Sequence, residues 1–241
     1  MAVKRIEVTD LGTVNFYKRK NVRSIRLSIT SQNQIRVSLP FWVPYAAAVR
    51  FVLSKRDWVK GQIIPTTLLQ NLDRIGKSHH ITFQPLADCV VPRARTQSGG
   101  EIKITYPVDA SPNDAKVQRV AQRAALRALK QQATSLLVPR LRELAHRHGF
   151  VHGIISIKRL KSRWGSCSSQ GDIVLNSYLM QLPWHLIDYV LLHELTHTRI
   201  MAHGPRFWEE MEKFVPNLKE ARKEIRKYRP VLTTHEAKHK L

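Results

Sequence analysis

The chain has 241 residues, of which 43% are hydrophobic, enough to bury the core of one or two domains. It carries 40 Lys and Arg against 18 Asp and Glu, giving a net charge of +22 that is spread along the whole chain. This charge favours contact with nucleic acid or acidic protein, and a generally basic surface indicates non-specific contact more than a dedicated groove. No stretch reaches the roughly 20 apolar residues of a membrane helix. The charged first ten residues do not resemble a signal peptide. We therefore expect a cytoplasmic protein without a membrane segment.

Residues 1–110 are predicted to form a small β-rich N-terminal domain. Residues 22–30 and 34–39 alternate between polar and apolar side chains, as expected for two paired strands. A helix is predicted from residue 44 to residue 63, with Trp58 packed against the sheet.

Two further strands are predicted at residues 80–84 and 102–106, with a Gly- and Ser-rich turn between them. Pro107 and Pro112 follow the second of these strands. Since proline interrupts regular structure, we place the domain boundary here.

Residues 111–229 are predicted to form the second domain, which begins with a long helix over residues 114–148. Gly149 is the expected stop of this helix, and Pro139 is expected to kink or break it. The polar tail, residues 230–241, is expected to be flexible.

Residues 154–158 and 172–175 read as two strands that flank a loop containing Trp164 and Gly165. An edge strand at this position could pair with an extended peptide, so we expect the pair to border a substrate cleft. The alternative is that Trp164 belongs to the core and Gly165 only makes a turn. Cys167 is expected to be a small buried residue, since nothing in the sequence pairs it with a base.

A nearly all-apolar helix is predicted from Pro183 to Ile200, and His193, Glu194 and His197 lie near its end. Two histidines four residues apart lie about 40° apart around a helix, so both rings can reach one ion. Glu194 projects from the same turn and can polarise a water on that ion. Two histidines and a carboxylate at the end of a buried helix would be costly without a partner, and a zinc ion supplies one.

The third ligand depends on where this helix ends. If the helix ran on, His203 would sit about 9 Å beyond His197 and about 120° around the axis, out of reach of the same ion. Gly204 and Pro205 favour a turn followed by a new helix, Pro205 to Phe214. The sequence thus favours His203, and the alternatives lie on the following helix: Glu209, Glu210 and Glu212.

Four stretches resemble the YgjP-like metal-dependent hydrolases, relatives of the SprT and WLM zinc-protease groups. They are Ser162 to Cys167, Ile173 to Asn176, Asp188 to His197, and His203 to Trp208. The resemblance implies that His193, His197 and His203 are the metal ligands and that Glu194 is the catalytic base. One departure is Ala202, where the family usually has Asn.

The resemblance also implies an α+β fold. A small β-rich N-terminal part with a helix would precede a zincin-like domain, which would have a long helix, a short antiparallel sheet and the metal helix. We expect a zinc-dependent hydrolase, specifically a metallopeptidase acting on a protein or peptide substrate. The alternative is a basic nucleic-acid-associated protein, including a DNA-linked protease, whose zinc is mainly structural. Tyr178 and Arg206 flank the motif and are candidates for oxyanion stabilisation, although the sequence favours a structural role for each.

Overall fold

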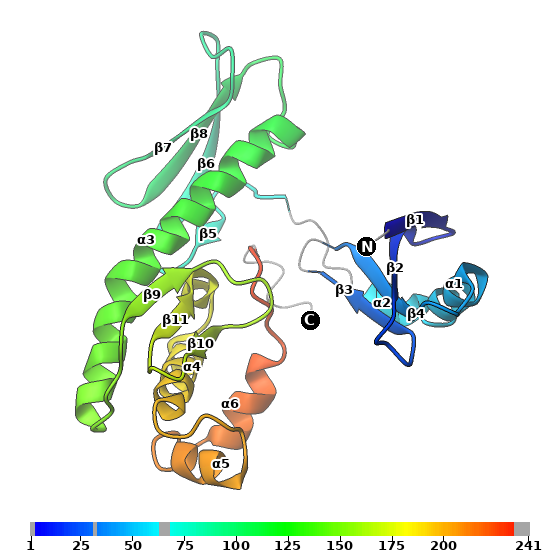
Figure 1. Cartoon of the computed structure of the whole chain (residues 1–241). Helices are drawn as coiled ribbons and strands as arrows, with labels where there is room; N and C mark the ends of the chain where they lie inside the picture. Colours follow the sequence, from blue (N-terminus) through cyan, green and yellow to red (C-terminus); the bar gives the residue numbers. More distant parts are fainter. Residues whose placement is uncertain (1–2, 31–32, 63–67, 234–241) are drawn as a thin grey trace. The chain divides into compact units, whose positions relative to one another are not determined.

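The computed structural model describes residues 3–30, 33–62 and 68–233 (Figure 1). The chain divides into two compact units, Met1–Thr66 and Thr67–Leu241. The predicted boundary near residue 110 differs from this division, because the strands before it pack against the long helix that follows it. Each unit is described by itself.

The first unit holds one four-stranded sheet and two helices. These elements are β1 (Val3–Val8), β2 (Gly12–Arg19), β3 (Arg26–Ile29), β4 (Ile35–Pro40), α1 (Tyr45–Ser54) and α2 (Arg56–Gln62). The strand order is β1-β2-β4-β3, with β2 parallel to β4 and the other pairs antiparallel. The predicted pairing of β3 with β4 is confirmed, whereas the single predicted helix is divided at Lys55.

One face of this sheet and the two helices form the core of the first unit. Alternate residues of β2 and β4 are fully buried, among them Phe16 and Val37, and they pack with Val52 of α1 and Val59 of α2. The prediction that Trp58 packs against the sheet is wrong. Its neighbour Val59 faces the core, so Trp58 points outward and is 48% exposed.

The second unit begins with another four-stranded sheet and the long helix. These elements are β5 (Arg74–Ile75), β6 (His79–Leu86), β7 (Arg93–Thr96), β8 (Glu101–Pro107) and α3 (Ala115–Arg147). The remaining elements are β9 (Ile155–Lys158), β10 (Gly165–Cys167), β11 (Ile173–Asn176), the 3-10 helix η1 (Ser177–Gln181), α4 (Trp184–His197), α5 (Pro205–Glu212) and α6 (Leu218–Ile225).

The two four-stranded sheets have the same topology and the same register. The second has the order β5-β6-β8-β7, again with the two central strands parallel. Each pairing of β4 with β2 and with β3 recurs 67 residues later in the second sheet, as do the last two pairings of β1 with β2. Examples are Val14–Ile35 and Ile81–Ile102, Leu27–Val37 and Ala94–Ile104, and Val8–Gly12 and Ile75–His79. The chain therefore contains an internal structural repeat, with a helix after each copy.

Two buried glutamines of α3 attach the second sheet to this helix. Gln118 Nε2 donates to the carbonyl of Leu69, and Gln132 Nε2 donates to that of Ile75, at 2.8 and 2.9 Å. Polar groups buried in this way are stabilising only when they are paired. These bonds fix the segment before β6 on α3, which explains why it belongs to the second unit.

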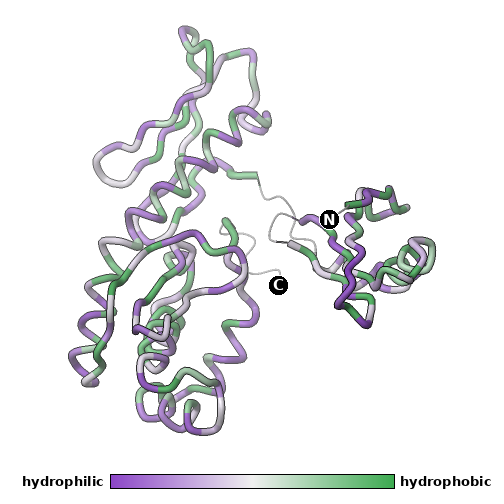
Figure 2. Tube along the Cα trace, in the orientation of Figure 1, coloured by the Kyte–Doolittle hydropathy of each residue, from purple (hydrophilic) through white to green (hydrophobic). Residues whose placement is uncertain are grey.

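The long helix α3 organises the second unit, with β5–β8 along its first half and β9–β11 and α4 along its second (Figure 1). Its ends match the prediction closely, and Gly149 follows it with a φ of 65°. Pro139 does not break the helix, which continues through it. Figure 2 shows hydrophilic and hydrophobic positions alternating along α3.

The small sheet beside α4 has the order β10-β11-β9. The prediction of an antiparallel sheet is wrong in part. β10 and β11 are antiparallel, but β9 and β11 are parallel, and the predicted loop between them itself contains β10. The fold is thus a mixed α+β arrangement of several small sheets around a long helix.

The described part of the predicted tail reaches Thr233 and is tied to η1. Gln181 Nε2 donates to the carbonyl of Val231 at 2.6 Å, and the N–H of Thr233 donates to Gln181 Oε1 at 3.0 Å. The rest of the predicted flexible tail, residues 234–241, lies outside the described residues. None of the helices in the described part of the chain has the length and apolar character needed to cross a bilayer.

Candidate metal centre

The helix α4 carries the first two histidines into the interior of the second unit. Pro183 precedes it in an extended conformation suited to a helix start. Most of its apolar residues are buried, Leu186 and Leu191 completely, because the helix packs between α3, β10, α5 and α6. Asp188 also holds it to α3, since both carboxylate oxygens accept from the guanidinium of Arg140, at 2.9 and 2.7 Å. The helix is therefore a rigid support for the side chains at its end.

The turn after α4 returns the chain towards the two histidines. The helix ends at His197, and the N–H of Ile200 bonds the carbonyl of Thr196 at 2.9 Å as the chain leaves the helical path. Gly204 then precedes α5, with Pro205 in its first turn. This turn places His203 beside the other two imidazoles, where a continuous helix could not have placed it.

The three imidazoles converge through their Nε2 atoms. The separations are 3.2 Å between His193 and His197, and 3.0 Å from His203 to each of them. Two nitrogen ligands of a tetrahedral zinc, each about 2.05 Å from the ion, lie about 3.3 Å apart. The triangle thus has nearly the dimensions of a three-histidine metal site. It is the only such cluster of potential ligands in the described part of the chain.

The protonation of one ring is consistent with this role. His197 Nδ1 lies 3.1 Å from the carbonyl of Ile200, so it is the nitrogen that donates a proton, and Nε2 keeps its lone pair. Three nitrogens that face one another in a triangle cannot all satisfy one another by hydrogen bonds. A cation between them resolves this, and the residues therefore fit a metal ion.

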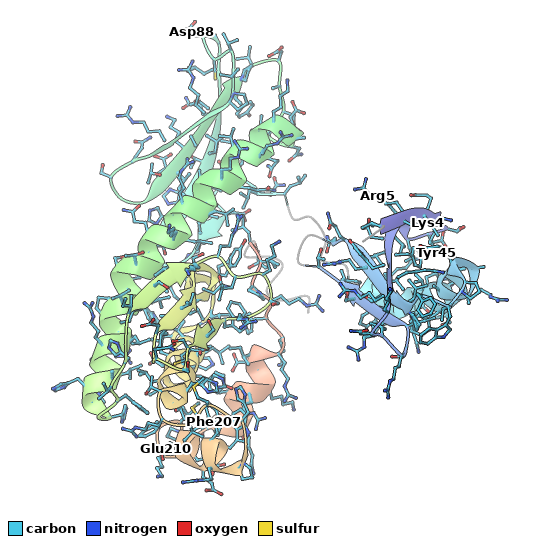
Figure 3. All side chains as sticks on the ribbon, viewed as in Figure 1. Lys4, Arg5, Tyr45, Asp88, Phe207 and Glu210 are labelled. Carbon is cyan, nitrogen blue, oxygen red and sulfur yellow. The ribbon has the colours of Figure 1, made fainter. Side chains whose placement is uncertain are left out.

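Two aromatic residues of α5 support the triangle from one side. Phe207 is fully buried, and its ring centroid lies 4.9, 4.6 and 4.9 Å from those of His193, His197 and His203 (Figure 3). Trp208 stacks on the ring of His203 at 5.8 Å, and Arg222 of α6 lies over Trp208 at 3.7 Å. Packing of this kind restricts the orientation of the imidazoles before any ion binds.

The alternative ligands on α5 are placed elsewhere. Glu210 (Figure 3) accepts from Arg199 and from Lys213, both at 2.7 Å. These cations lower the pKa of Glu210, with Lys213 as the larger cause. Glu209 and Glu212 are likewise outside the histidine cluster. The structure thus brings His203, not these glutamates, to the other two histidines.

Glu194 lies beside the triangle and is almost completely buried, with 5% of its surface exposed. Its carboxylate lies against the backbone of Gly165 on β10. A Cβ at that position would be 2.5 Å from Glu194 Oε1 and 2.7 Å from Cγ. Burial raises the pKa of Glu194 to about 8, and the positive charge of Arg163 opposes this shift. Burial and the two neighbouring imidazoles lower the pKa of His193 to about 3, which keeps this ring neutral.

A cavity of about 520 Å³ opens at the histidines and Glu194. This volume lies within the range of small-ligand sites. The cavity is bounded by β10 and the residues before it, by α4, and by residues after α4: Arg163, Trp164, Gly165, Ser166, Cys167, Tyr189, Val190, His193, Glu194, His197, Met201, His203 and Ile225. The two strands predicted to border a cleft, β9 and β11, do not line this cavity. The segment between them lines it instead, through Arg163, Trp164 and β10, and Trp164 also packs on the core.

The oxyanion candidates taken from the sequence are not at this cavity. Tyr178 is buried in η1 and Arg206 is exposed on α5, and neither lines it. Sequence reasoning missed Tyr189, which does line it and lies one helical turn before His193. That spacing on the same helix was the signal that could have identified it.

Asn176, at the end of β11, fixes the loop that precedes β10. It is fully buried, and its Nδ2 donates to the carbonyls of Leu160 and Arg163, at 2.9 and 2.8 Å. Its N–H donates to the carbonyl of Trp164 at 2.9 Å. These bonds position Arg163 and Trp164 at the cavity.

Cys167 is partly buried on β10, as expected of a residue without a base to activate it. Burial, with smaller contributions from Glu194 and Asp172, raises the pKa of its thiol to about 11. Cys167 and Cys89 are both free thiols. Cys167 is therefore neutral at physiological pH and unsuited to act as a nucleophile.

A family model described as YgjP-like, metallopeptidase domain, matches residues 23–228. Among solved structures, the chain is similar to the metallopeptidase zymogen abylysin of Pyrococcus abyssi, with 28% identity over 35% of this chain and 87% of that one, at a TM-score of 0.33. It is also similar to the zymogen jannalysin of Methanocaldococcus jannaschii, with 27% identity over 35% of this chain and 88% of that one, at a TM-score of 0.32. No curated protein matches the chain.

Proposed function

Because the chain belongs to the YgjP-like metallopeptidase family, we propose that it is a zinc-dependent peptidase in which His193, His197 and His203 hold the metal and Glu194 is the general base. The observation that carries this proposal is the triangle of three Nε2 atoms, 3.0 to 3.2 Å apart, beside a buried carboxylate and an open cavity.

The donor set favours zinc. Neutral imidazoles are suitable ligands for zinc and for other late transition metals, whereas magnesium and calcium prefer oxygen donors. Two histidines four residues apart on a helix, with Glu after the first, form the pattern typical of zinc peptidases. When bound, zinc supplies a Lewis acid for the substrate carbonyl and lowers the pKa of a water molecule.

Glu194 is suited to move protons at this site. Its carboxylate projects from the same helical turn as His193, and it would accept a proton from the attacking water and then deliver it to the departing amine. Its burial favours the protonated form, and a nearby dication favours the ionised form. These opposing effects would hold its pKa near the working range of a general acid and base.

The substrate is proposed to be an extended peptide lying along β10. This strand is at the edge of its sheet, so one side of its backbone is not paired within the order β10-β11-β9. Peptides bind such edges through main-chain hydrogen bonds, with side chains in neighbouring pockets. Trp164 and Met201 supply apolar walls of the cavity, and Arg163 supplies a positive charge.

We assign oxyanion stabilisation to Tyr189, in place of Tyr178 and Arg206. Its hydroxyl belongs to a residue that lines the cavity, and burial raises the pKa of this phenol, so it remains a hydrogen-bond donor at neutral pH. A Tyr189→Phe variant should keep its zinc and its KM but lose about 10²-fold in kcat. Unchanged kcat would remove Tyr189 from this role.

The test of the proposal is the Glu194→Gln variant. It should retain one zinc per chain and lose turnover of peptide substrates. Full activity of this variant would refute Glu194 as the base. X-ray absorption spectroscopy of the zinc-loaded protein identifies the ligands of the zinc. It therefore distinguishes a catalytic zinc from the alternative, a structural zinc, which has four protein ligands. A zinc with three nitrogen ligands and one exchangeable oxygen ligand supports the proposal of an enzyme. A zinc with a fourth side chain as ligand supports the structural alternative.

A further inference from the structure

The first unit carries more positive charge per residue than the rest of the chain. Residues 1–66 contain 12 Lys or Arg and 3 Asp or Glu, a net charge of +9, against +13 in the other 175 residues. Arg56 is the one basic side chain of this unit that forms ion pairs among the described residues, with Asp10 and Asp57. The other basic side chains of this unit have no acidic partner among the described residues, so their charge is not neutralised there.

Much of this charge lies on the face of the first sheet that points away from α1 and α2, which we call the first outer face. Because side chains alternate along a strand, the residues between the buried ones share this face. They include Arg5 on β1, Asn15, Tyr17 and Arg19 on β2, Arg36 on β4, and Arg26 on β3. Figure 3 labels Arg5, which points away from the unit, and Lys4, which lies near Tyr45 on the helix side.

The register places these residues in two adjacent rows across the sheet. Tyr17 pairs with Ser38, which pairs with Arg26, and Asn15 pairs with Arg36 in the next row. The guanidinium of Arg36 lies over the Tyr17 ring at 4.6 Å. This half-buried pair of an aromatic ring and a guanidinium lies on the two central strands, with further arginines around it, and combines a stacking surface with phosphate ligands.

Because of the internal repeat, the second sheet has some of the same basic positions as the first outer face. On its face away from α3, the second outer face, Arg93 and Lys103 occupy the positions of Arg26 and Arg36, 67 residues later. Arg95 lies beside Lys103 on the same face, and Arg93 and Arg95 are exposed. The position of Tyr17 is taken by Gln84, so only the first outer face has the aromatic platform.

We propose that the two outer faces bind single-stranded nucleic acid, the first through stacking and phosphate contacts and the second through phosphate contacts alone. Charge complementarity selects a polyanion, and Tyr17 on an open four-stranded sheet selects unpaired bases over a duplex. Two modules on one chain would bind a long strand more tightly than either would alone, because the second contact is intramolecular. This proposal does not depend on the metal site.

The test is fluorescence anisotropy of the full chain with a labelled oligothymidylate of about 20 nucleotides, and with one about twice as long, across a salt series from about 50 to 200 mM. Arg5→Ala with Arg26→Ala should lower the affinity at least about tenfold and reduce the slope of log K against log salt by about 1.4, since each phosphate contact in a single strand contributes about 0.7. Arg93→Ala with Arg95→Ala should reduce the slope similarly and weaken mainly the longer oligonucleotide.

Arg119→Ala with Arg123→Ala is the matched control, since it removes the same charge from exposed positions on α3. It should change neither affinity nor slope. Tyr17→Leu should weaken binding at least about fivefold without altering the slope, and Tyr17→Phe should bind like the wild type. Thermal melts of each variant separate lost binding from lost folding.

Three results would overturn the proposal. The control could weaken binding as much as the outer-face variants do, which would mean that the affinity depends on the total charge of the protein and not on these two faces. A duplex of equal length could bind more tightly while Tyr17→Leu has no effect. Polyglutamate at equal charge could displace the oligonucleotide as well as unlabelled oligonucleotide does, which would indicate an acidic polypeptide instead.

Discussion

Gly165 and Glu194 are in contact so close that position 165 has no room for a side chain. A Cβ there would lie 2.5 Å from Glu194 Oε1 and 2.7 Å from its Cγ, well inside van der Waals contact. The glycine of an edge strand thus defines the position of the proposed base. This relationship connects β10, along which we place the substrate, to the helix that carries the histidines.

The Gly165→Ala variant should therefore shift the Glu194 carboxylate. We expect kcat to fall at least about tenfold, because small displacements of a catalytic group are costly. Zinc content should be unchanged, since the three atoms nearest to the added Cβ all belong to Glu194 and none to a histidine. The measurements are steady-state kinetics and metal analysis of the same preparation.

Gly61→Ala is the control for this variant, since an added Cβ there meets nothing within 4 Å. It should retain full activity. Wild-type kcat in Gly165→Ala would contradict the view that this contact positions the carboxylate.

Arg199 holds the turn between His197 and His203. Its Nη2 donates to the carbonyls of His148 and Gly149 at 3.0 and 2.8 Å, and its guanidinium lies 4.0 Å from the Phe150 ring centroid. Arg199→Ala should lower the free energy of unfolding by about 2–3 kcal/mol, because the carbonyls lose a charged donor. Zinc affinity should fall about tenfold as His203 loses its support. Urea unfolding and chelator competition measure the two effects.

Lys213→Ala provides the comparison for Arg199→Ala. Lys213 also contacts Glu210, in an ion pair of 2.7 Å, but it is exposed at the end of α5. Exposed pairs contribute little, so we expect a loss of at most about 0.5 kcal/mol and unchanged zinc affinity. Equal effects of the two substitutions would show that Arg199 acts only through Glu210.

Cys167 should be slow to react with alkylating reagents. With a pKa raised to about 11, chiefly by burial, its thiol is almost fully protonated at neutral pH. In a Cys89→Ser background, iodoacetamide labelling at pH 8 should be about 10²-fold slower than in the urea-unfolded chain, whose thiol has a pKa of about 8.5. The folded rate should keep rising until the pH passes the raised pKa. A rate that levels off near pH 8.5 would contradict this assignment.

The sequence predicted best those features that depend on residues close together in the chain. The spacing of His193 and His197, the turn before Pro205 and the glycine stop after α3 are local, and helical geometry is enough to interpret them. The structure places these residues accordingly: α4 ends at His197, and the chain turns before α5.

The features that the sequence did not predict depend on contacts between distant residues. Three contacts have no local signature in the sequence: the parallel pairing of β9 with β11, the approach of Gly165 to Glu194, and the attachment of β5–β8 to α3 through Gln118 and Gln132. The internal repeat, in contrast, did have a signature in the sequence. Residues 26–40 and 93–107 both begin with Arg, end with Pro and alternate in the same phase.

Zinc analysis of the wild type beside a His203→Ala variant tests the central claim most directly. We predict one zinc per chain in the wild type and loss of that zinc in the variant, because two imidazoles from α4 alone cannot hold the ion tightly. Thermal unfolding of the metal-free proteins checks that the variant is folded. Retention of a full equivalent of zinc by folded His203→Ala would contradict the account.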